Sequence, residues 1–259
     1  MGYKKAYRGI DISLYQGEPD FRAVKNAGMD FVILKASQGR TAEYNAPFED
    51  PKFRTNVKRL SSQGGLYAGA YHYFCARNEK EADEEADFFI KLVSEYRFDL
   101  QLWAALDVED SGFLPSDKAK LTALVARFCG KVKAAGLRPM VYANSWWLDS
   151  RFDSPAGVPV WEADWSPGKL PERCRMWQYS STGRVVGING NVDMNVAFDI
   201  IGDANSDGSV DMKDVIRVIR SVSGWDVRID ESQADVNSDG YVNMKDIIQT
   251  IRTLGEDGK

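Results

Sequence analysis

Hydrophobic and polar positions follow two different periodicities along the first 200 residues of this 259-residue chain. Short runs of apolar and β-branched residues have the length of strands, and between them apolar residues recur every three or four positions, as on one helix face. The strand-like runs cover residues 8–13, 31–37, 66–74, 102–109, 138–144, 159–165, 175–180 and 191–198. The helical pattern fills the early gaps, over residues 19–28, 50–64, 78–96 and 116–136.

Alternating strands and helices predict a parallel sheet, and eight strands of this kind fit a closed barrel. The later gaps are too short for full helices, so we expect loops between the last strands. An open doubly wound sheet is the structural alternative. No G-x-G-x-x-G motif follows the first strand, which argues against a dinucleotide-binding form of that alternative.

The last 58 residues contain one twelve-residue motif twice, DANSDGSVDMKD from Asp203 to Asp214 and DVNSDGYVNMKD from Asp235 to Asp246. Each copy has oxygen-bearing side chains at positions one, three, five, nine and twelve, and a glycine at position six. A hard cation such as calcium takes six to eight oxygen ligands, and the sharp turn at position six requires glycine. A short amphipathic helix is predicted after each loop, but none before the first, so the repeating unit is loop–helix.

The sequence therefore predicts two structural calcium ions and no cofactor for catalysis. The predicted ligands are Asp203, Asn205, Asp207, Ser209, Asp211 and Asp214 in the first loop, and Asp235, Asn237, Asp239, Tyr241, Asn243 and Asp246 in the second.

Residues 201–259 resemble the type I dockerin, a small all-α calcium-binding domain of two loop–helix repeats that attaches an enzyme to a cohesin. The resemblance implies that the partner is a cohesin domain of a scaffoldin. A calcium buffer or a purely structural calcium tail is the alternative, but such proteins keep the entering helix. Residues 203–220 and 235–252 are identical at twelve of eighteen positions, which predicts two near-equivalent faces.

Charge and composition argue against several classes of function. From Gly202 onward there are 12 acidic and 7 basic residues, so the whole net charge of −5 lies in this tail. The remainder has no basic excess, which argues against nucleic-acid binding. No run of about 18 apolar residues predicts a membrane span. Calcium loops of this kind fit the roughly millimolar calcium concentration outside cells, so we expect a secreted or scaffold-bound protein. We also expect a monomer apart from the cohesin complex.

Polar residues gather at the predicted strand ends, where the active sites of such barrels lie. Asp11 ends the first strand, His72 lies on the third, Asp107 and Glu109 end the fourth, and Asp193 lies on the eighth. Alternation places Asp107 and Glu109 on one face of their strand. Two acids in an apolar barrel are costly unless they are paired or functional, and neighbouring acids raise one another's pKa, as a general acid near neutral pH requires.

Five segments in order, GIDISLYQG, GAYHYF, LDVED, WQYS and VDMN, are similar to the lysozymes of glycoside hydrolase family 25. This resemblance covers nearly all of residues 6–200 and implies an α/β fold, an irregular (β/α) barrel with eight strands and about five helices over residues 1–200. It also implies cleavage of the β-1,4 bond between N-acetylmuramic acid and N-acetylglucosamine in peptidoglycan glycan strands.

By position, the resemblance implies that Glu109 is the general acid and that Asp107 is its charge partner, which orients the substrate acetamido group. Asp11 and Asp193 would be supporting acids. The residues implied to line the sugar groove are Tyr71, His72, Tyr142, Trp177 and Gln178. Asp164 either reaches the groove or braces the neighbouring loop, and His72 is also interpretable as a satisfied core histidine.

Two mechanisms remain open. A retaining glycosidase can use a carboxylate nucleophile about 5 Å from its acid, or the acetamido group of its substrate. The Asp-x-Glu pair favours the second route. The alternative functions are a non-catalytic carbohydrate-binding barrel, against which the four intact acids argue, and an acetamido-assisted chitinase-like glycosidase, whose acidic motif is longer than LDVED.

Overall fold

The computed structural model describes residues 3–96, 100, 102–166, 174–200, 202–205, 210–237 and 240–256. The chain divides into two compact units. One comprises residues 7–197, and the other comprises residues 198–259 together with residues 1–6.

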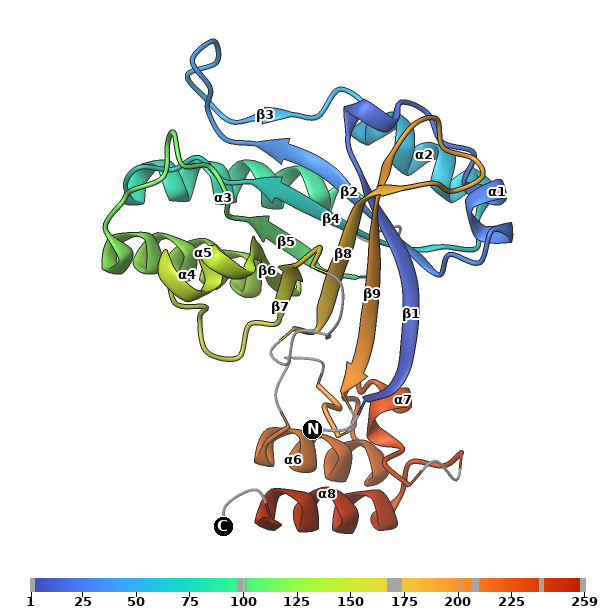
Figure 1. The fold of residues 1–259 in the computed structure, drawn as a ribbon. Coiled ribbons are helices and arrows are strands. Elements are labelled where there is room, and N and C mark those ends of the chain that lie inside the picture. The colour runs from blue at the N-terminus through green and yellow to red at the C-terminus, as the bar shows by residue number, and fades with distance from the viewer. Residues whose placement is uncertain are drawn as a thin grey trace. The chain divides into compact units, whose positions relative to one another are not determined.

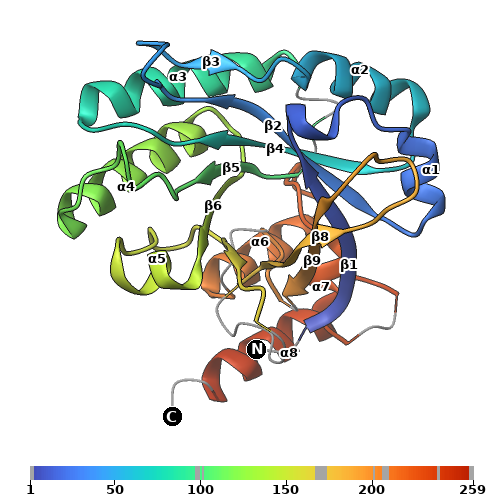
Figure 2. The same cartoon turned by 45° about the horizontal axis from the view of Figure 1, so that its top comes forward.

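Eight strands form a closed barrel (Figures 1 and 2). They are β1 (Tyr3–Ile12), β2 (Phe31–Gln38), β4 (Tyr67–Tyr73), β5 (Ala104–Asp107), β6 (Pro139–Asn144), β7 (Val160–Ala163), β8 (Met176–Gly183) and β9 (Val192–Ile200). The order around the ring is β1-β9-β8-β7-β6-β5-β4-β2, and parallel pairing of β2 with β1 closes it. β9 runs antiparallel to β8, so the beginning of β9 lies at the same end of the barrel as the carboxyl end of β8. All eight predicted strands are confirmed.

One further strand was not predicted. β3 (Phe48–Glu49) pairs antiparallel with the end of β2 and lies outside the ring. With two residues, it is too short to produce a recognisable alternation in the sequence.

Among the described residues, five α-helices accompany the barrel strands: α1 (Phe21–Asn26), α2 (Phe53–Gln63), α3 (Glu79–Ser94), α4 (Lys118–Ala134) and α5 (Ser145–Ser150). The first four confirm the helical patterns of the sequence. In α1, α3, α4 and α5 the side chain of the residue before the helix accepts a hydrogen bond from a backbone N–H of the first turn. These capping residues are Asp20, Asn78, Asp117 and Asn144 respectively. Such caps satisfy backbone donors that the helix cannot pair. The six-residue α5 was not predicted, because one and a half turns carry little periodicity.

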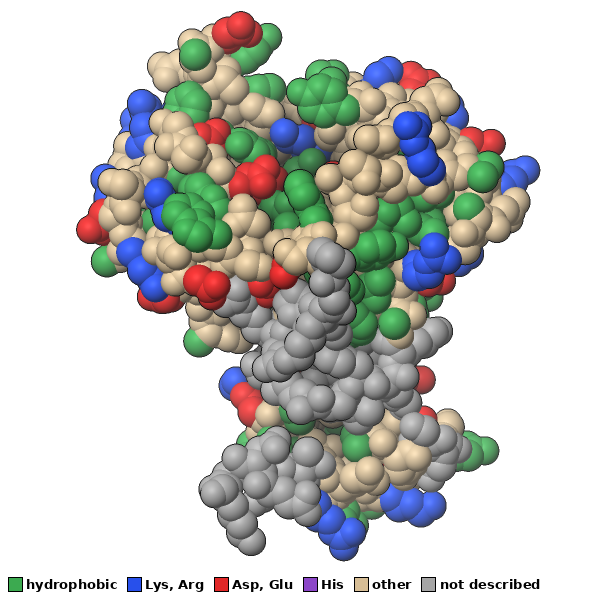
Figure 3. Space-filling view, viewed as in Figure 1, with side chains coloured by type: hydrophobic (Ala, Val, Ile, Leu, Met, Phe, Trp, Pro, Cys, Tyr) green, Lys and Arg blue, Asp and Glu red, His purple; other side chains and the backbone are tan. Residues whose placement is uncertain are grey.

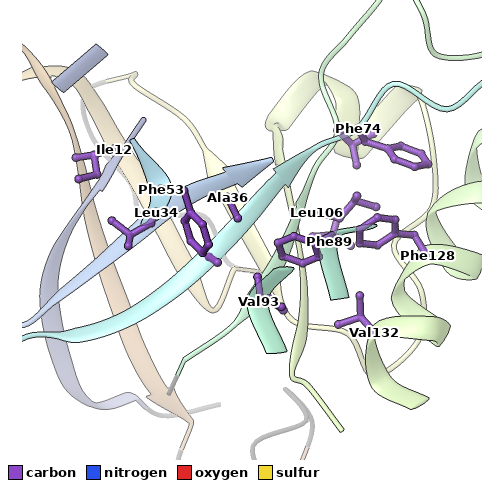
Figure 4. Packing of buried hydrophobic residues seen from close by; sticks show 14 of the residues in the cluster. Ile12, Leu34, Ala36, Phe53, Phe74, Phe89, Val93, Leu106, Phe128 and Val132 are labelled. Atoms are coloured by element: carbon purple, nitrogen blue, oxygen red, sulfur yellow. The ribbon is translucent and has the colours of Figure 1, made fainter. Parts of the chain in front are cut away.

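The hydrophobic core has two layers. The outer layer packs the strands against the helices, with Phe89 of α3 and Phe128 of α4 facing Leu106 of β5 and Phe74 (Figure 4). The inner layer fills the barrel itself, and Trp161 is its largest fully buried side chain.

The second unit contains α6 (Met212–Val222), α7 (Glu231–Ala234) and α8 (Met244–Glu256). Val215, Val218 and Ile247 are buried against Ala204 and Ala234, which makes a small core between the two longer helices. The two predicted helices are confirmed, and the four-residue α7 before the second loop was not predicted.

Within the described part of the chain, no helix has both the length and the apolar character that a membrane span requires. Cys75 and Cys129 are buried free thiols, and Cys174 is also buried.

Phe128 offers a test of the outer core. Its ring is fully buried, with centroids 5.4 Å from His72, 5.7 Å from Phe74 and 5.9 Å from Phe89. Replacement by alanine should lower the free energy of unfolding of the barrel by about 3–5 kcal/mol, because it removes these contacts and leaves a cavity. Urea unfolding followed by tryptophan fluorescence measures the loss. The control Tyr67→Ala, at a 59% exposed side chain, should change the stability by less than about 0.5 kcal/mol. A loss under about 1 kcal/mol for Phe128→Ala would contradict this packing.

Candidate functional site

Four acidic residues meet at the end of the barrel where β1, β5 and β8 end. Asp11 lies on β1 and Asp107 at the end of β5, and their side chains are only 5% and 6% exposed. Asp193 is half-buried near the start of β9, and Glu109 is exposed two residues after β5. In Figure 3, acidic and basic side chains lie beside hydrophobic ones across the centre of the barrel face that is visible.

Asp107 and Glu109 face the same way because the ladder continues one residue beyond β5. The backbone N–H of Val108 donates to the carbonyl of Tyr142 at 2.9 Å, and the Val108 side chain is buried in the outer core. Alternation then turns the residues on either side of Val108 toward the barrel mouth. The sequence pattern predicted this arrangement.

Asp11 is held by two amide side chains. Its Oδ2 accepts a hydrogen bond from Gln178 Nε2 at 3.0 Å and from Asn195 Nδ2 at 2.8 Å. The Asp11 and Asp193 carboxyls also lie close enough for the charge of Asp193 to raise the pKa of Asp11. Asp11 and Asp193 therefore act as one unit at the mouth.

The two amides are themselves oriented by aromatic donors. Gln178 Oε1 accepts from the hydroxyl of Tyr142 at 3.1 Å and from Nε1 of Trp165 at 3.2 Å. Asn195 Oδ1 accepts from Trp161 Nε1 at 2.9 Å. Because each amide oxygen is occupied by donors, each NH₂ group points at Asp11. Asn195 was not among the predicted site residues, although it follows Asp193 by two positions and so shares its strand face.

Burial raises the pKa values of the acids. It raises the pKa of Asp11 to about 8; the charge of Asp193 adds to this increase, while the bonds from Asn195 and Gln178 oppose it. The pKa of Asp107 is raised well above its usual range, by burial first and then by the charge of Glu109.

The pKa of Glu109 is also raised. Protein atoms that displace water from its carboxyl are the largest cause, and the charge of Asp193 adds to the effect. The positive charge of Lys35 lowers the pKa of both Glu109 and Asp107, which limits the rise. An exposed carboxyl that keeps its proton nearer to neutral pH is what a general acid requires.

Alternation places Lys35 on the inner face of β2, two residues after the inner-core residue Ile33. The pairing of β2 with β4 shifts register between Lys35 and Ser37, which marks a β-bulge. Lys35 Nζ donates to Gln38 Oε1 at 3.0 Å and lies 4.8 Å from the centre of the Tyr73 ring. The bulge turns Ser37 to the outer side of the sheet.

His72 lies on that outer side, and the prediction that it lines the sugar groove is wrong. Its side chain has no exposed surface. Nδ1 is 2.8 Å from Ser37 Oγ, Nε2 is 3.0 Å from Glu85 Oε2, and the ring packs against Phe89 and Phe128. On β4, alternation directs Tyr71 and Tyr73 inward and His72 between them outward. The interpretation as a satisfied core histidine is the one that the contacts support.

Of the remaining predicted groove residues, Tyr71, Tyr142 and Gln178 lie on the inner face, and the Trp177 ring packs against Tyr179 with a centroid distance of 5.5 Å. Tyr71 and Tyr142 both pack edge-on against Trp161, with ring centroids 6.2 and 4.7 Å away. Burial raises the pKa of both tyrosines, and Asp11, Asp107 and Asp193 each add to it, so the phenols stay neutral beside the acids.

Asp164 braces a loop at the rim. Its Oδ1 accepts the backbone N–H of Ser166 at 2.9 Å, and its carbonyl accepts from Trp177 Nε1 at 2.8 Å. Of the two interpretations given to Asp164, these bonds favour the brace.

The two calcium loops have the same internal bonding. Asp214, at position twelve of the first loop, accepts the backbone N–H groups of Asn205 at 3.0 Å and Asp211 at 2.9 Å. Asp246 does the same for Asn237 at 3.2 Å and Asn243 at 2.9 Å. Each last carboxylate therefore ties positions three and nine of its loop together.

The donor chemistry of the loops fits a hard cation. The carboxylates of Asp203, Asp214 and Asp246 are almost fully buried, a costly state for charges without a cation. Gly240, at position six, has φ +86° and donates its N–H to Asp235 Oδ2 at 3.2 Å. Three predicted ligands, Asp207, Ser209 and Asp239, lie outside the described residues, as does Gly208. In the described ranges alone, no group of three or more His, Cys, Asp or Glu side chains is arranged to hold a metal ion.

Comparison with known families agrees with both resemblances found in the sequence. Residues 10–188 match the family model of glycosyl hydrolases family 25. Residues 201–255 match the model of the dockerin type I domain, a class that generally binds calcium.

Two curated relatives illustrate the first match. Lysozyme M1 of Streptomyces globisporus is 31% identical over 207 residues, which cover 73% of this chain and 66% of that protein. The N,O-diacetylmuramidase of Chalaropsis sp is 30% identical over 208 residues, which cover 72% of this chain and 95% of that protein.

Solved structures share the barrel. The modular autolysin LytC from Streptococcus pneumoniae, in complex with a synthetic peptidoglycan ligand, aligns with a TM-score of 0.66 and 26% identity over 76% of this chain. The bacterial lysozyme from Streptomyces coelicolor aligns with a TM-score of 0.59 and 26% identity, over 74% of this chain and 92% of that one. The match spans only 47% of the LytC chain, so this chain corresponds to less than half of that modular protein.

The raised pKa of Asp11 predicts a specific dependence of stability on pH. The folded state holds a proton on Asp11 that the unfolded chain releases near its ordinary pKa of 3.8, so stability should fall as pH rises from about 4 toward about 8.

Asp11→Asn mimics the protonated carboxyl and should remove part of this fall. We expect its melting temperature to exceed that of the wild type by a few degrees at pH 8 and by less at pH 5, since 1 kcal/mol shifts the midpoint by about 2–4 °C in domains of this size. Calorimetry at both pH values tests this. An equal offset at both would contradict a proton held by Asp11.

Proposed function

The chain belongs to glycosyl hydrolase family 25, and we propose that it is a secreted lysozyme that a dockerin attaches to a scaffold. Its reaction would be that of an N-acetylmuramidase, which cleaves the β-1,4 bond between N-acetylmuramic acid and N-acetylglucosamine. The observation that carries this proposal is the pairing of exposed Glu109 with buried Asp107 on one face of β5, beside the Asp11–Asp193 unit.

Glu109 is the general acid in this proposal. Its raised pKa keeps the carboxyl protonated at higher pH than a free glutamate, and its exposure lets it reach a bound glycan. It donates its proton to the glycosidic oxygen as the bond to the anomeric carbon breaks, so the leaving sugar departs as a neutral alcohol.

Asp107 orients the substrate acetamido group. Among the described residues, its buried Oδ1 has no hydrogen-bond partner, an unusual and costly state for a buried acceptor. The N–H of a bound acetamido group is a donor of the kind this oxygen lacks. The acetamido oxygen then attacks the anomeric carbon and forms a cyclic intermediate, while Asp107 stabilises the positive charge on nitrogen.

Water completes the reaction with Glu109 as the general base. Glu109 lost its proton in the first step, so it accepts one from the attacking water and returns to its initial state. The water oxygen bonds to the anomeric carbon, and the ring opens to restore the acetamido group. Two displacements at the same carbon retain its configuration.

The Asp11–Asp193 unit supports these steps electrostatically. The negative charge of Asp193 raises the pKa of Glu109, and the amides of Gln178 and Asn195 fix Asp11 beside it. Because the pKa of Asp11 is raised to about 8, its carboxyl is protonated near neutral pH and the site carries less negative charge than four ionised acids would give.

Aromatic side chains at the mouth suit a sugar ligand. Tyr71, Tyr142 and Trp177 offer partly apolar faces, and the Trp165 ring is 57% exposed at the rim while its Nε1 is held by Gln178. Flat apolar surfaces with fixed polar groups recognise the two faces and the hydroxyls of a sugar ring. That LytC was solved with a peptidoglycan ligand, and that relatives are named lysozyme and diacetylmuramidase, supports peptidoglycan as the substrate class.

The dockerin would hold two calcium ions, one in each loop, and bind a cohesin domain of a scaffoldin. The equal bonding of Asp214 and Asp246 supports one ion per loop, and two divalent ions would largely neutralise the net charge of −5 that the tail carries. Extracellular calcium and a cell-wall substrate both support a location outside the cell. We propose a monomer apart from the cohesin complex, with a domain boundary near residue 200.

Glu109→Gln tests the general acid. The amide is nearly isosteric but cannot donate the proton, so cell-wall hydrolysis should fall by about 10²–10⁴-fold while the melting temperature is retained. Clearing of bacterial cell-wall suspensions gives the rate. The control Glu95→Gln replaces an exposed carboxylate at the end of α3 that pairs with Arg54 and with none of the site acids, and it should keep normal activity. Soluble chitin oligomers run in parallel identify a chitinase-like enzyme.

Retention of more than half of the wall-clearing rate by Glu109→Gln would overturn the assignment, and no wall clearing by the wild type would favour a non-catalytic binding barrel.

Chelation tests the calcium proposal. The second unit has a core of few residues, so its folding should depend on metal binding, whereas none of the proposed barrel chemistry uses a metal. EDTA should remove one calorimetric transition and leave wall hydrolysis unchanged, and added calcium should restore the transition. Loss of hydrolysis in EDTA, or an unchanged scan, would contradict the proposal.

A further inference from the structure

Three buried side chains, which we call the outer chain, connect the end of β2 to β4 and to α3. Ser37 Oγ lies 2.8 Å from His72 Nδ1, and His72 Nε2 lies 3.0 Å from Glu85 Oε2. None of the three has exposed surface. Glu85 Oε2 also accepts the backbone N–H of Cys75 at 3.0 Å, so this oxygen is the acceptor and Nε2 is the donor. Nδ1 is then left to accept the hydroxyl of Ser37.

The outer chain lies at a β-bulge that changes which residues face the barrel mouth. Strict alternation from the inward Lys35 would turn Ser37 inward and Gln38 outward. In the structure Ser37 pairs with His72, which faces outward. Gln38 pairs with Tyr73, which faces inward. The extra residue of the bulge therefore turns Ser37 to the outer core and Gln38 to the mouth.

The inward turn of Gln38 gives Lys35 a partner at the mouth. Gln38 Oε1 accepts a hydrogen bond from Lys35 Nζ at 3.0 Å, and the same Nζ lies 4.8 Å from the centre of the Tyr73 ring. The charge of Lys35 lowers the pKa of Glu109 and of Asp107, so the position of its ammonium group affects both acids. Without the bulge, Gln38 would lie on the outer face and Lys35 would lose this acceptor.

Helix α3 also holds the residues that follow the bulge. Gly39 lies so close to α3 that an added Cβ would be 2.3 Å from Glu85 Oε1. Arg40 is only 5% exposed, and it pairs with Glu81 at 2.6 Å and with Glu84 at 2.9 Å. Three acids of one helix therefore hold the end of β2 in its bulged path.

We propose that the outer chain positions the proton donor of the barrel mouth, a proposal that rests on the proposed function of Glu109. The outer chain holds the bulge, the bulge places Gln38 at the mouth, and Gln38 holds Lys35 beside the acids. Because the three side chains are fully buried on the outer side of the sheet, they act without contacting the substrate. They are positioning residues.

Titration of the Glu109 carboxyl in the full-length protein tests this path. Ser37→Ala removes the hydroxyl that His72 accepts, so the pKa of Glu109 should rise as Lys35 loses its fixed position. Lys35→Met removes the charge itself and should raise the pKa further. In the Lys35→Met background, Ser37→Ala should cause no additional rise, because two changes on one path are not additive. NMR of protein labelled with ¹³C at the glutamate carboxyls gives each pKa without turnover.

The pH profile of cell-wall clearing gives a second measurement. The first step needs protonated Glu109, so the fall in rate at high pH should move to higher pH in Ser37→Ala. The charges of Asp107, Asp110 and Asp193 also act at this site, and they are the same in every variant.

Two further comparisons separate positioning from packing. Phe128→Leu changes the ring that stacks on His72 at 5.4 Å but keeps every bond of the outer chain. It should lower the melting temperature and leave the pKa of Glu109 unchanged. Glu85→Leu removes the acceptor and should raise that pKa, whereas Glu85→Gln keeps an acceptor oxygen and should restore the wild-type value.

Three results would overturn the proposal. An unchanged pKa of Glu109 in folded Ser37→Ala would mean that the outer chain serves the core alone. An equal rise in Phe128→Leu would mean that lost stability is the cause. A further rise from Ser37→Ala in the Lys35→Met background would mean that the effect bypasses Lys35.

Gln38→Ala keeps the test decisive if Ser37→Ala does not fold. It frees Lys35 at the mouth end of the path and should also raise the pKa of Glu109, so a wild-type value would overturn the proposal. Absence of wall clearing by the wild type would count against the proposed function, while the titration would still decide whether the outer chain positions Glu109.

Discussion

The burial of carboxyl groups at the barrel mouth is the constraint on which the rest of the site depends. An ionised carboxylate in an apolar interior costs several kcal/mol unless it is paired or gives up its charge. Here Asp11 is held by two amides and burial raises its pKa to about 8, while the positive charge of Lys35 lowers the pKa of Asp107. The indole N–H groups of Trp161 and Trp165 donate to these amides and fix their orientation. The direction of the polar groups at the mouth therefore depends on aromatic side chains.

The two faces of the barrel strands have different roles. Inward residues of β4 and β5 serve the mouth, while outward residues such as His72 and Leu106 join the barrel to α3 and α4. The bulge at the end of β2 changes this division by one residue, which turns Ser37 outward toward His72 while Lys35 stays at the mouth. Alternation along β2 thus supplies the acids with a cation, and the bulge supplies His72 with a hydroxyl partner.

Periodicity predicted the eight strands and the four longer helices because each spans several repeats of its pattern. It missed β3 and α5, which are too short to show a period. The assignment of both Tyr71 and His72 to the groove was inconsistent with alternation, which places neighbouring residues of a strand on opposite faces. Asp107 and Glu109 were predictable from alternation alone. Asn195 was not singled out, because an amide on a strand carries no signal until its bonds to Asp11 and Trp161 are seen.

Proton donation by Glu109 depends on the rise that the barrel mouth causes in the pKa of its carboxyl. The most direct test is an NMR titration of protein labelled with ¹³C at the glutamate side-chain carboxyls, with the Glu109 signal identified by its loss in the amide variant. The structure predicts a midpoint clearly above the ordinary value of 4.5, which falls when Asp193 is replaced by asparagine, because the charge of Asp193 contributes to the rise. A midpoint at or below 4.5, insensitive to Asp193, would contradict the account.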